Sequence, residues 1–262
     1  VRDLGGQIGE FETLTQNMGE LESAIAISSF RAMMKDWCVP ELTGSKEVFL
    51  KAEQIYHPMI EDPVKNSISV KQGVLLTGSN ASGKSTFLKT VAVNGILAQT
   101  IHTCLADRYA SSFYHMYTSM ALRDDLQSQE SYYIVEIRAL KRILDQARGD
   151  IPVLCFVDEV LRGTNTVERI AASSQILKSL PDRQVFCFAA THDIELTHLL
   201  EKLYHNYHFE EQIGEKDIYF PYRLIPGRAV SRNAIRLLAL MGYDSRIIRE
   251  AEDTAEHFVK TG

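Results

Sequence analysis

A short glycine-containing loop is the feature that most restricts what this chain can fold into. The loop is Gly78-Ser79-Asn80-Ala81-Ser82-Gly83-Lys84-Ser85-Thr86. An apolar stretch at 74–77 precedes it and predicts a buried strand, and apolar residues recur at helical spacing over 86–99. A strand, a glycine loop and a helix in this order are typical of a loop that binds nucleotide phosphates. We therefore predict a nucleoside triphosphate site here, rather than a plain glycine turn.

The residue types in this loop fit the chemistry of phosphate binding. Gly78 and Gly83 let the backbone bend so that successive N–H groups face phosphate oxygens. The start of the following helix adds a partial positive charge behind them. Lys84 can neutralise the β- and γ-phosphates, and Ser85 can present its hydroxyl to Mg²⁺. The predicted ligands are therefore ATP or ADP together with Mg²⁺.

Two acidic residues and a histidine follow two apolar stretches further along the chain. Asp158 and Glu159 come directly after 153–157, and His192 comes shortly after 185–190. Asp158 can hold Mg²⁺ through water, and Glu159 can accept a proton from an attacking water, which favours hydrolysis over binding alone. His192 can reach the γ-phosphate and sense its loss. The alternatives are a solvated acidic pair and a structural histidine.

Apolar strands alternate with helices through the middle of the chain, which predicts an α/β fold with a mostly parallel sheet flanked by helices. We expect one or two strands in 109–120, helices at 132–148 and 166–180, paired strands at 206–211 and 217–224, and helices at 233–241 and 245–259. Ahead of the loop we expect a loose lead-in over 1–16, a helix over 17–37 that ends before Pro40, and strands at 47–53 and 68–70.

Composition narrows the class of protein. The chain has 262 residues, a net charge of −6 and no block of like charge, so nothing indicates a broad nucleic-acid-binding surface. No apolar run approaches the roughly 18 residues of a membrane span, and there is no secretory signal. The four cysteines form no CxxC pair, which favours reduced thiols and a cytoplasmic location. The chain begins with Val1 rather than Met, so we expect a piece of a longer protein.

Two histidines three residues apart, His205 and His208, raise the question of a metal site. No carboxylate or thiol nearby in the sequence completes a ligand set. A packing role is therefore favoured over metal binding.

Together these motifs resemble the ATPase domain of the MutS family of DNA mismatch-repair proteins and their paralogues. The loop is similar to the family's G-P-N-M-G-G-K-S-T, with Ser79 and Ala81 in place of Pro and Met. Residues 124–136 look like D-D-L-x-x-x-x-S-T-F-x-V-E, 158–166 like D-E-x-x-R-G-T-S-T, and 190–196 like A-T-H-x-x-E-L. The departures favour a divergent MutS-like paralogue.

The resemblance implies a P-loop NTPase of ABC-type architecture. Residues 1–45 would be the end of a helical lever or connector, and 46–262 the ATPase domain with C-terminal dimerisation helices. Two copies would form a homodimer in which each nucleotide lies between one subunit's loop and the other subunit's Ser131. Residues 162–166 would lie at the dimer seam, and Asn80 would contact phosphate. DNA would be bound mainly through domains absent from this chain, and no membrane is involved.

The resemblance also implies that an aromatic side chain stacks on the adenine. The corresponding position is Tyr222, with Val64 opposite, although Tyr222 could equally be a strand residue that faces the core. Two other functions stay open at this point. One is another ABC-type ATPase, such as an SMC-like protein or a transporter subunit, and the other is a nucleotide-gated interaction module with negligible turnover.

Overall fold

The computed structural model describes residues 8–44, 47–79, 81–120, 132–147, 149–161, 165–214, 218–229 and 234–261. The chain divides into two units. The first comprises Val1–Ser69 and Thr90–Phe113, and the second comprises Val70–Lys89 and Tyr114–Gly262. The predicted division at residue 45 stays a prediction.

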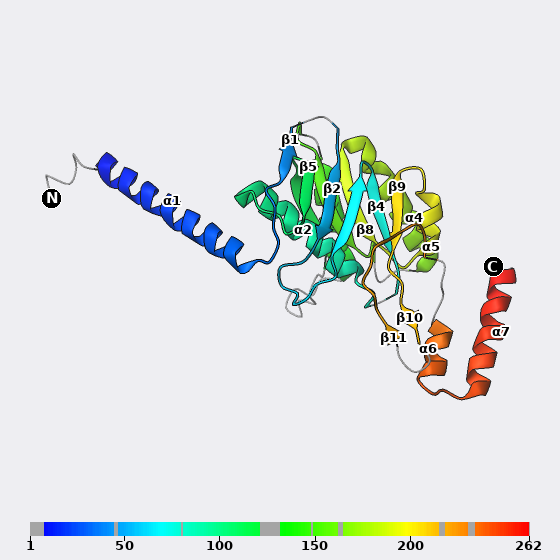
Figure 1. Ribbon diagram of the computed structural model, residues 1–262. Helices are drawn as coiled ribbons and strands as arrows, with labels where there is room; N and C mark the ends of the chain where they lie inside the picture. Colours follow the sequence, from blue (N-terminus) through cyan, green and yellow to red (C-terminus); the bar gives the residue numbers. More distant parts are fainter. Residues whose placement is uncertain are drawn as a thin grey trace. The chain divides into compact units, whose positions relative to one another are not determined.

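The first unit contains a long helix and a four-stranded mixed sheet. The helix α1 spans Ile8–Met33 (Figure 1). The sheet has the order β1-β5-β2-β3, with β1 at Glu41–Thr43, β5 at Arg108–Ser112, β2 at Leu50–Ile55 and β3 at Asn66–Val70, whose last residue belongs to the second unit. β1 pairs with β5 in parallel, and β2 pairs with β5 antiparallel.

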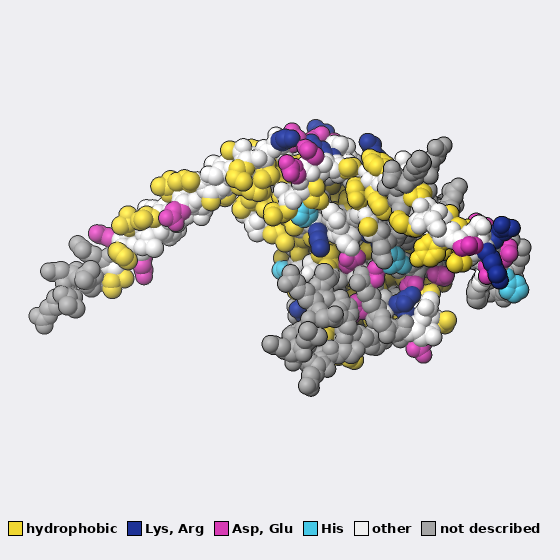
Figure 2. Space-filling view, turned by 90° about the horizontal axis from the view of Figure 1, so that it is seen from below, with side chains coloured by type: hydrophobic (Ala, Val, Ile, Leu, Met, Phe, Trp, Pro, Cys, Tyr) yellow, Lys and Arg dark blue, Asp and Glu magenta, His cyan; other side chains and the backbone are white. Residues whose placement is uncertain are grey.

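Helix α1 begins earlier and ends earlier than the sequence predicted. Residues 8–16 were expected to form a loose lead-in but are helical, because the apolar spacing continues toward the N-terminus through Leu14 and Phe11 to Ile8. No residue of α1 is buried, and hydrophobic side chains lie exposed along it (Figure 2). At its C-terminal end, Arg31 donates to Thr103 Oγ1 at 2.9 Å and to the carbonyl of Ile101 at 3.2 Å. These bonds fix the end of α1 within the first unit.

A six-stranded sheet forms the centre of the second unit. Its order is β12-β9-β4-β8-β7-β6. The strands are β4 at Gly73–Thr77, β6 at His115–Ser119, β7 at Val153–Asp158, β8 at Val185–Ala190, β9 at Tyr204–His208 and β12 at Ile225–Pro226. Neighbouring strands from β9 to β6 pair in parallel, and only β12 pairs antiparallel, with β9. The α/β class is thus confirmed, with mixed sheets.

The helices and the short hairpin mostly match the sequence expectations. The helices are α2 at Lys84–Ile101, α3 at Tyr132–Gln146, α4 at Thr166–Ser179, α5 at Ile194–Leu199, α6 at Ala234–Leu240 and α7 at Ser245–Thr261, with a short 3₁₀ turn, η2, at Pro181–Arg183. The expected pairing of 206–211 with 217–224 was wrong in its first strand. β9 joins the large sheet beside β4, and the hairpin pairs only β10, Gln212–Ile213, with β11, Ile218–Tyr219.

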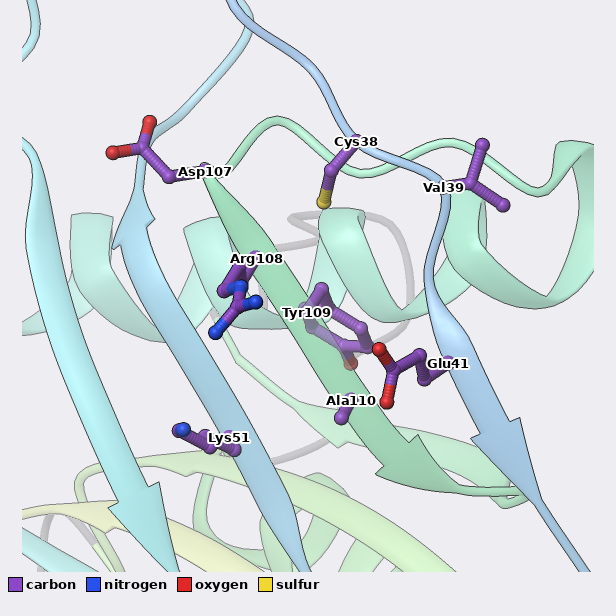
Figure 3. A pocket seen from close by; sticks show the side chains of 8 residues that line it. All are labelled: Cys38, Val39, Glu41, Lys51, Asp107, Arg108, Tyr109 and Ala110. Atoms are coloured by element: carbon purple, nitrogen blue, oxygen red, sulfur yellow. The ribbon is translucent and has the colours of Figure 1, made fainter.

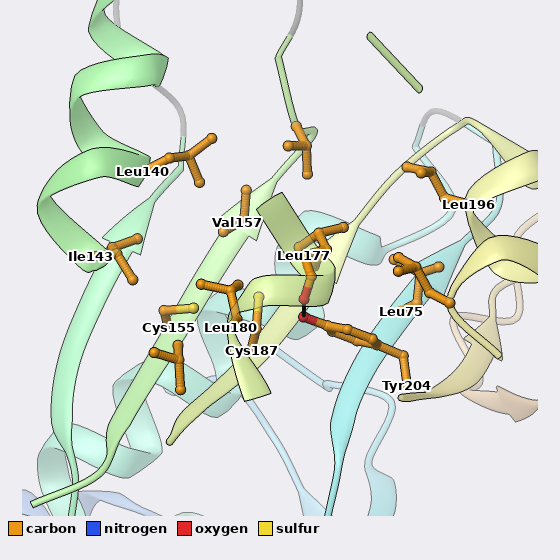
Figure 4. Close-up of a cluster of buried hydrophobic side chains, with 14 of the residues drawn as sticks. Leu75, Leu140, Ile143, Cys155, Val157, Leu177, Leu180, Cys187, Leu196 and Tyr204 are labelled. Atoms are coloured by element: carbon orange, nitrogen blue, oxygen red, sulfur yellow. Dashed lines mark hydrogen bonds between the residues drawn. The ribbon is translucent and has the colours of Figure 1, made fainter. Parts of the chain in front are cut away.

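One hydrophobic cluster fills the face of the large sheet that α3, α4 and α5 cover. Alternate strand residues such as Cys155 and Cys187 point into it together with Leu177 and Leu196 (Figure 4). Tyr204 is 2% exposed, and its hydroxyl donates to the carbonyl of Leu177 at 2.9 Å. The opposite face is buried as well, because Phe156, Phe186 and Phe188 form a chain of ring contacts there. Burial on both faces explains the continuous apolar strands.

Candidate functional site

The candidate site lies where the parallel strands of the second unit end. Thr77, Asp158 and Ala190 are each the last residue of their strand. Asp158 is in register with Ala190, and Leu76 also pairs with Ala190, so the three strands finish at one edge. Ligands of open α/β sheets bind outside this carboxyl edge. The glycine loop and the two predicted polar motifs all leave the sheet there.

The glycine loop adopts backbone angles that only glycine takes without strain. Gly78 has φ = 137° and Gly83 has φ = 111°, and Ala81 between them has φ = 67°. A Cβ on Gly78 would lie 2.4 Å from the carbonyl oxygen of Phe209. Both glycines are therefore required by the turn. The predicted role of glycine as a residue that lets the backbone bend agrees with this geometry.

A segment that the sequence did not single out lies beside the loop. Phe209 donates its N–H to the carbonyl of Thr77 at 3.0 Å, directly before the loop. Two residues later, Glu211 Oε2 accepts a hydrogen bond from Ser79 Oγ at 2.6 Å. Ser79 departs from the family's motif, and its hydroxyl was the signal that could have indicated a partner. The loop is thus tied to the end of β9.

The side chain of Lys84 is held by backbone carbonyls of the glycine loop. The ammonium donates to the carbonyls of Gly78 at 2.6 Å and Ser79 at 2.7 Å, and the side chain is 5% exposed. Ser82 also donates to the carbonyl of Ser79, at 2.8 Å. The loop is therefore a closed turn around a buried cation. Next to it, Ser85 is half-buried and Thr86 is exposed at the start of α2.

The acidic pair combines an unpaired carboxylate oxygen with a strained residue. Among the described residues, Asp158 Oδ1 is buried and has no hydrogen-bond partner. Glu159 follows with φ = 62°, an angle that costs a non-glycine residue on the order of 1–3 kcal/mol and that clusters at functional sites. Its N–H donates to the carbonyl of Ala190 at 3.0 Å, which fixes it to the end of β8. A buried oxygen without a donor suits a cation.

His192 lies against Glu159. Its Nε2 is 2.6 Å from Glu159 Oε1, with the histidine side chain 37% exposed and the glutamate side chain 22% exposed. The next residue, Asp193, accepts two hydrogen bonds from Arg169 on α4. This pair raises the pKa of the Arg169 guanidinium, mainly through the hydrogen bond to Asp193. Nothing in the sequence indicated Arg169.

The two residues predicted to hold the adenine belong to different units. Tyr222 lies in the second unit with its ring against the loop, since a Cβ on Gly83 would be 3.1 Å from Tyr222 Cδ1. It is 45% exposed and has φ = 52°, so it is not a core residue. Val64 lies in the first unit, between β2 and β3, and is 40% exposed. Their pairing stays a prediction.

Several predicted site residues fall outside the described residues. These are Asn80, Ser131 with the preceding part of its motif, and residues 162–164. In the parts of the chain that the structure describes, no group of three or more His, Cys, Asp or Glu side chains could hold a metal. His208 is 8% exposed and bonds through Nδ1 to the carbonyl of Gly227, which supports a packing role for it, whereas His205 is exposed.

A pocket of about 320 Å³ lies in the first unit, and none of the predicted site residues lines it (Figure 3). Its charged lining consists of Glu41, Lys51, Asp107 and Arg108. Because two of these side chains are acidic and two are basic, the lining favours neither an anionic nor a cationic ligand. The remaining side chains include Cys38, whose pKa is raised by burial, so its thiol is not an activated nucleophile. No functional role follows from this pocket.

No described helix is both long and apolar enough to cross a membrane.

The fold and the site define an α/β protein with a glycine loop between a strand and a helix, and acidic and histidine residues at the ends of neighbouring strands. The chain belongs to the MutS family, because a family model described as MutS domain V matches residues 74–259. The resemblance seen in the sequence motifs is thus confirmed.

Curated relatives agree with this assignment. The chain is 32% identical to MutS protein homolog 4 of Mus musculus over 240 residues, which cover 84% of this chain and 24% of that protein. It is 30% identical to the DNA mismatch repair protein MutS of Thermus aquaticus, over 74% of this chain and 24% of that protein. The MutS of Lactobacillus delbrueckii subsp. bulgaricus is 28% identical, over 97% of this chain and 31% of that protein. The chain thus spans about a quarter to a third of these relatives.

Proposed function

We propose that this chain is the Mg²⁺-dependent ATPase domain of a MutS-like DNA-binding protein, with a P-loop NTPase fold of ABC-type architecture. The observation that carries the proposal is the shared edge of three parallel strands in the second unit. There the glycine loop follows β4, Asp158 ends β7 and Glu159 follows it, and His192 follows β8. A sensor, a base and a phosphate loop at one sheet edge are what ATP hydrolysis needs.

Nucleotide binding would use groups that the loop already holds in place. The backbone turn at Gly78 and Gly83 would let N–H groups face phosphate oxygens, as in other phosphate-binding loops. Lys84 is buried at the loop and would exchange its bonds to two loop carbonyls for phosphate oxygens. This exchange is favourable because a hydrogen bond between two charged groups is stronger than one to a neutral carbonyl.

The residues also fit a magnesium ion. The unpaired, buried Oδ1 of Asp158 is an oxygen ligand of the kind that Mg²⁺ prefers, and Ser85 would supply its hydroxyl. The absence of a larger described cluster agrees with Mg²⁺, which usually keeps several waters and phosphate oxygens in its shell. When bound, the ion would neutralise charge on the phosphates.

Hydrolysis would depend on Glu159 as the general base. Its contact with His192 at 2.6 Å involves one carboxylate oxygen, Oε1, and the attacking water would give its proton to the same carboxylate group. His192 would then be the residue that links the state of the base to the γ-phosphate. These steps support an enzyme over a module that only binds nucleotide.

A phosphate-release assay tests the proposal. Glu159→Gln should retain ATP binding and lose about 10²–10⁴-fold in turnover, because a positioned base contributes that much to rate. Lys84→Ala should weaken ATP binding itself. Glu168→Gln on α4 and Lys89→Ala on α2 are matched controls, because both side chains are exposed in the same unit. Wild-type turnover in Glu159→Gln contradicts the proposed base.

Assembly and DNA binding are further parts of the proposal. Two copies would form a dimer with two composite sites, in which Ser131 and residues 162–166 act across the seam. The family match and the printed names of the relatives, which include DNA mismatch repair proteins, support DNA as the wider partner. DNA would be contacted mainly by parts of the protein outside this chain, and the protein would be cytoplasmic.

A further inference from the structure

Arg169 and Asp193 form a two-point contact beside the proposed base and sensor. Arg169 Nε donates to Asp193 Oδ2 at 2.9 Å, and Nη2 donates to Oδ1 at 2.6 Å. The two side chains are 25% and 12% exposed, so solvent screens the pair only in part. A bidentate contact between a guanidinium and a carboxylate fixes direction as well as distance.

The side chain of Asp193 binds Arg169 instead of capping the helix that follows it. Asp193 is the residue before α5, where an aspartate usually caps the helix, but its side chain makes no capping bond. Instead the carboxylate binds Arg169, while the N–H of Asp193 bonds to Thr191 Oγ1 at 3.0 Å. The turn 191–193 is thus held from both of its ends.

His192 is the middle residue of this turn. Thr191 is anchored to β4, since its N–H donates to the carbonyl of Leu76 at 2.9 Å. His192 lies between Thr191 and Asp193, which are both fixed, and its Nε2 is 2.6 Å from Glu159 Oε1. The segments after β7 and β8 are therefore joined by two adjacent polar contacts, His192 with Glu159 and Arg169 with Asp193, and only the first involves the proposed base.

We propose that Arg169 is a positioning residue: through Asp193 it fixes the turn that carries His192, and so sets the contact between His192 and Glu159. This inference rests on the proposed function for its effect on turnover, but not for its effect on His192. Lysine could not replace Arg169, because an ammonium lacks the planar fork that holds both oxygens. The competing explanation is that the pair only joins α4 to α5.

The NMR signal of the His192 ring in the nucleotide-free protein tests the positioning directly. His192→Asn assigns the signal, and Glu159→Gln defines its shift when the contact to the carboxylate is lost. Arg169→Lys and Asp193→Asn should both move the His192 signal in the direction of the Glu159→Gln shift. Arg228→Lys is the matched control, because Arg228 binds Glu201 and the carbonyl of Thr197 at the other side of α5. It should leave the signal unchanged.

Steady-state kinetics then tests the consequence. Arg169→Lys should lower kcat by up to about 10²-fold, as small misplacements of reacting groups do, with little change in KM for ATP. An Arg169→Asp/Asp193→Arg double variant should recover part of the loss. An unchanged His192 signal in both Arg169→Lys and Asp193→Asn overturns the inference, whatever the turnover. If the His192 signal moves in these variants but the wild-type protein shows no ATPase activity, the proposed function is wrong and the positioning role still stands.

Discussion

Gly78 combines a backbone strain with a steric limit. Its φ of 137° is open only to glycine, and a Cβ would lie 2.4 Å from the carbonyl oxygen of Phe209. Gly227 has a similar φ of 101° but no neighbour within 4 Å of its would-be Cβ. The two glycines therefore separate the cost of strain from the cost of the clash.

We predict that Gly227→Ala lowers the free energy of unfolding by about 1–3 kcal/mol, the usual cost of such strain. Gly78→Ala should cost more, because Phe209 belongs to backbone that pairs with Thr77 and cannot move freely. Urea unfolding of both variants measures the difference. Gly149→Ala, at a position with neither a positive φ nor a neighbour, serves as the control. Equal losses in the first two variants would mean that the loop adapts around the added carbon.

Tyr222 offers a second test at the scale of one residue. Its ring lies near Gly83 and stacks on Phe220 at 6.1 Å, and the residue is 45% exposed. A base stacked there would gain roughly 1–3 kcal/mol, so Tyr222→Ala should weaken ATP binding by about that amount. Tyr219→Ala is the control, because Tyr219 is 62% exposed nearby in the sequence. Calorimetric titration with ATP decides. Unchanged affinity with lowered stability would assign Tyr222 to packing alone.

At the scale of elements, the sequence predicted what local chemistry determines and missed what tertiary contacts determine. The glycine loop, its strand and α2 were predicted because glycine, lysine and apolar spacing act within a few residues. The sequence predicted a hairpin for the β9 segment because Gly214 suggested a turn. In the structure β9 pairs with β4 instead, and this pairing buries Tyr204. The contacts of Ser79 with Glu211 and of Arg169 with Asp193 join residues far apart in sequence, and no local pattern encodes them.

Arg31 holds the C-terminal end of helix α1. Arg31 donates to Thr103 Oγ1 and to the carbonyls of Ile101 and His102, just past the end of α2. It also lies over the Trp37 ring at 4.6 Å. A cation at the end of a helix is favoured by the helix dipole and by the unpaired carbonyls there.

We predict that Arg31→Ala lowers the free energy of unfolding by about 1.5–3 kcal/mol, the range for hydrogen bonds made by a charged group. Hydrogen exchange should increase at residues 27–33, where α1 ends, more than in β7. Lys35→Ala is the control, since its pair with Asp62 is 3.7 Å long and both side chains are 88% exposed. If exchange rises equally throughout the protein, Arg31 contributes only to global stability.

At the scale of the whole molecule, the central question is whether one chain holds a complete site. In the second unit the described residues include the glycine loop and the proposed base and sensor, whereas the side chain proposed to act from the other subunit lies outside them. Ser131 is the proposed supplier, because it immediately precedes α3 and a serine before a helix suits an anion. The competing role is a cap for α3. A cap serves its own helix, so Ser131→Ala would then cost about 0.5–2 kcal/mol of stability and spare turnover.

Mixing two inactive variants separates these roles. We predict that Ser131→Ala lowers turnover and ATP-driven dimerisation while leaving stability nearly intact. Lys84→Ala damages the same site from the other subunit. In a heterodimer of the two variants, both lesions fall in one composite site and the second site is whole. Turnover should therefore rise on mixing, above the average of the separate variants. The average itself, measured where tagged heterodimers are shown to form, would mean that each chain works with its own Ser131 and that the site is not shared.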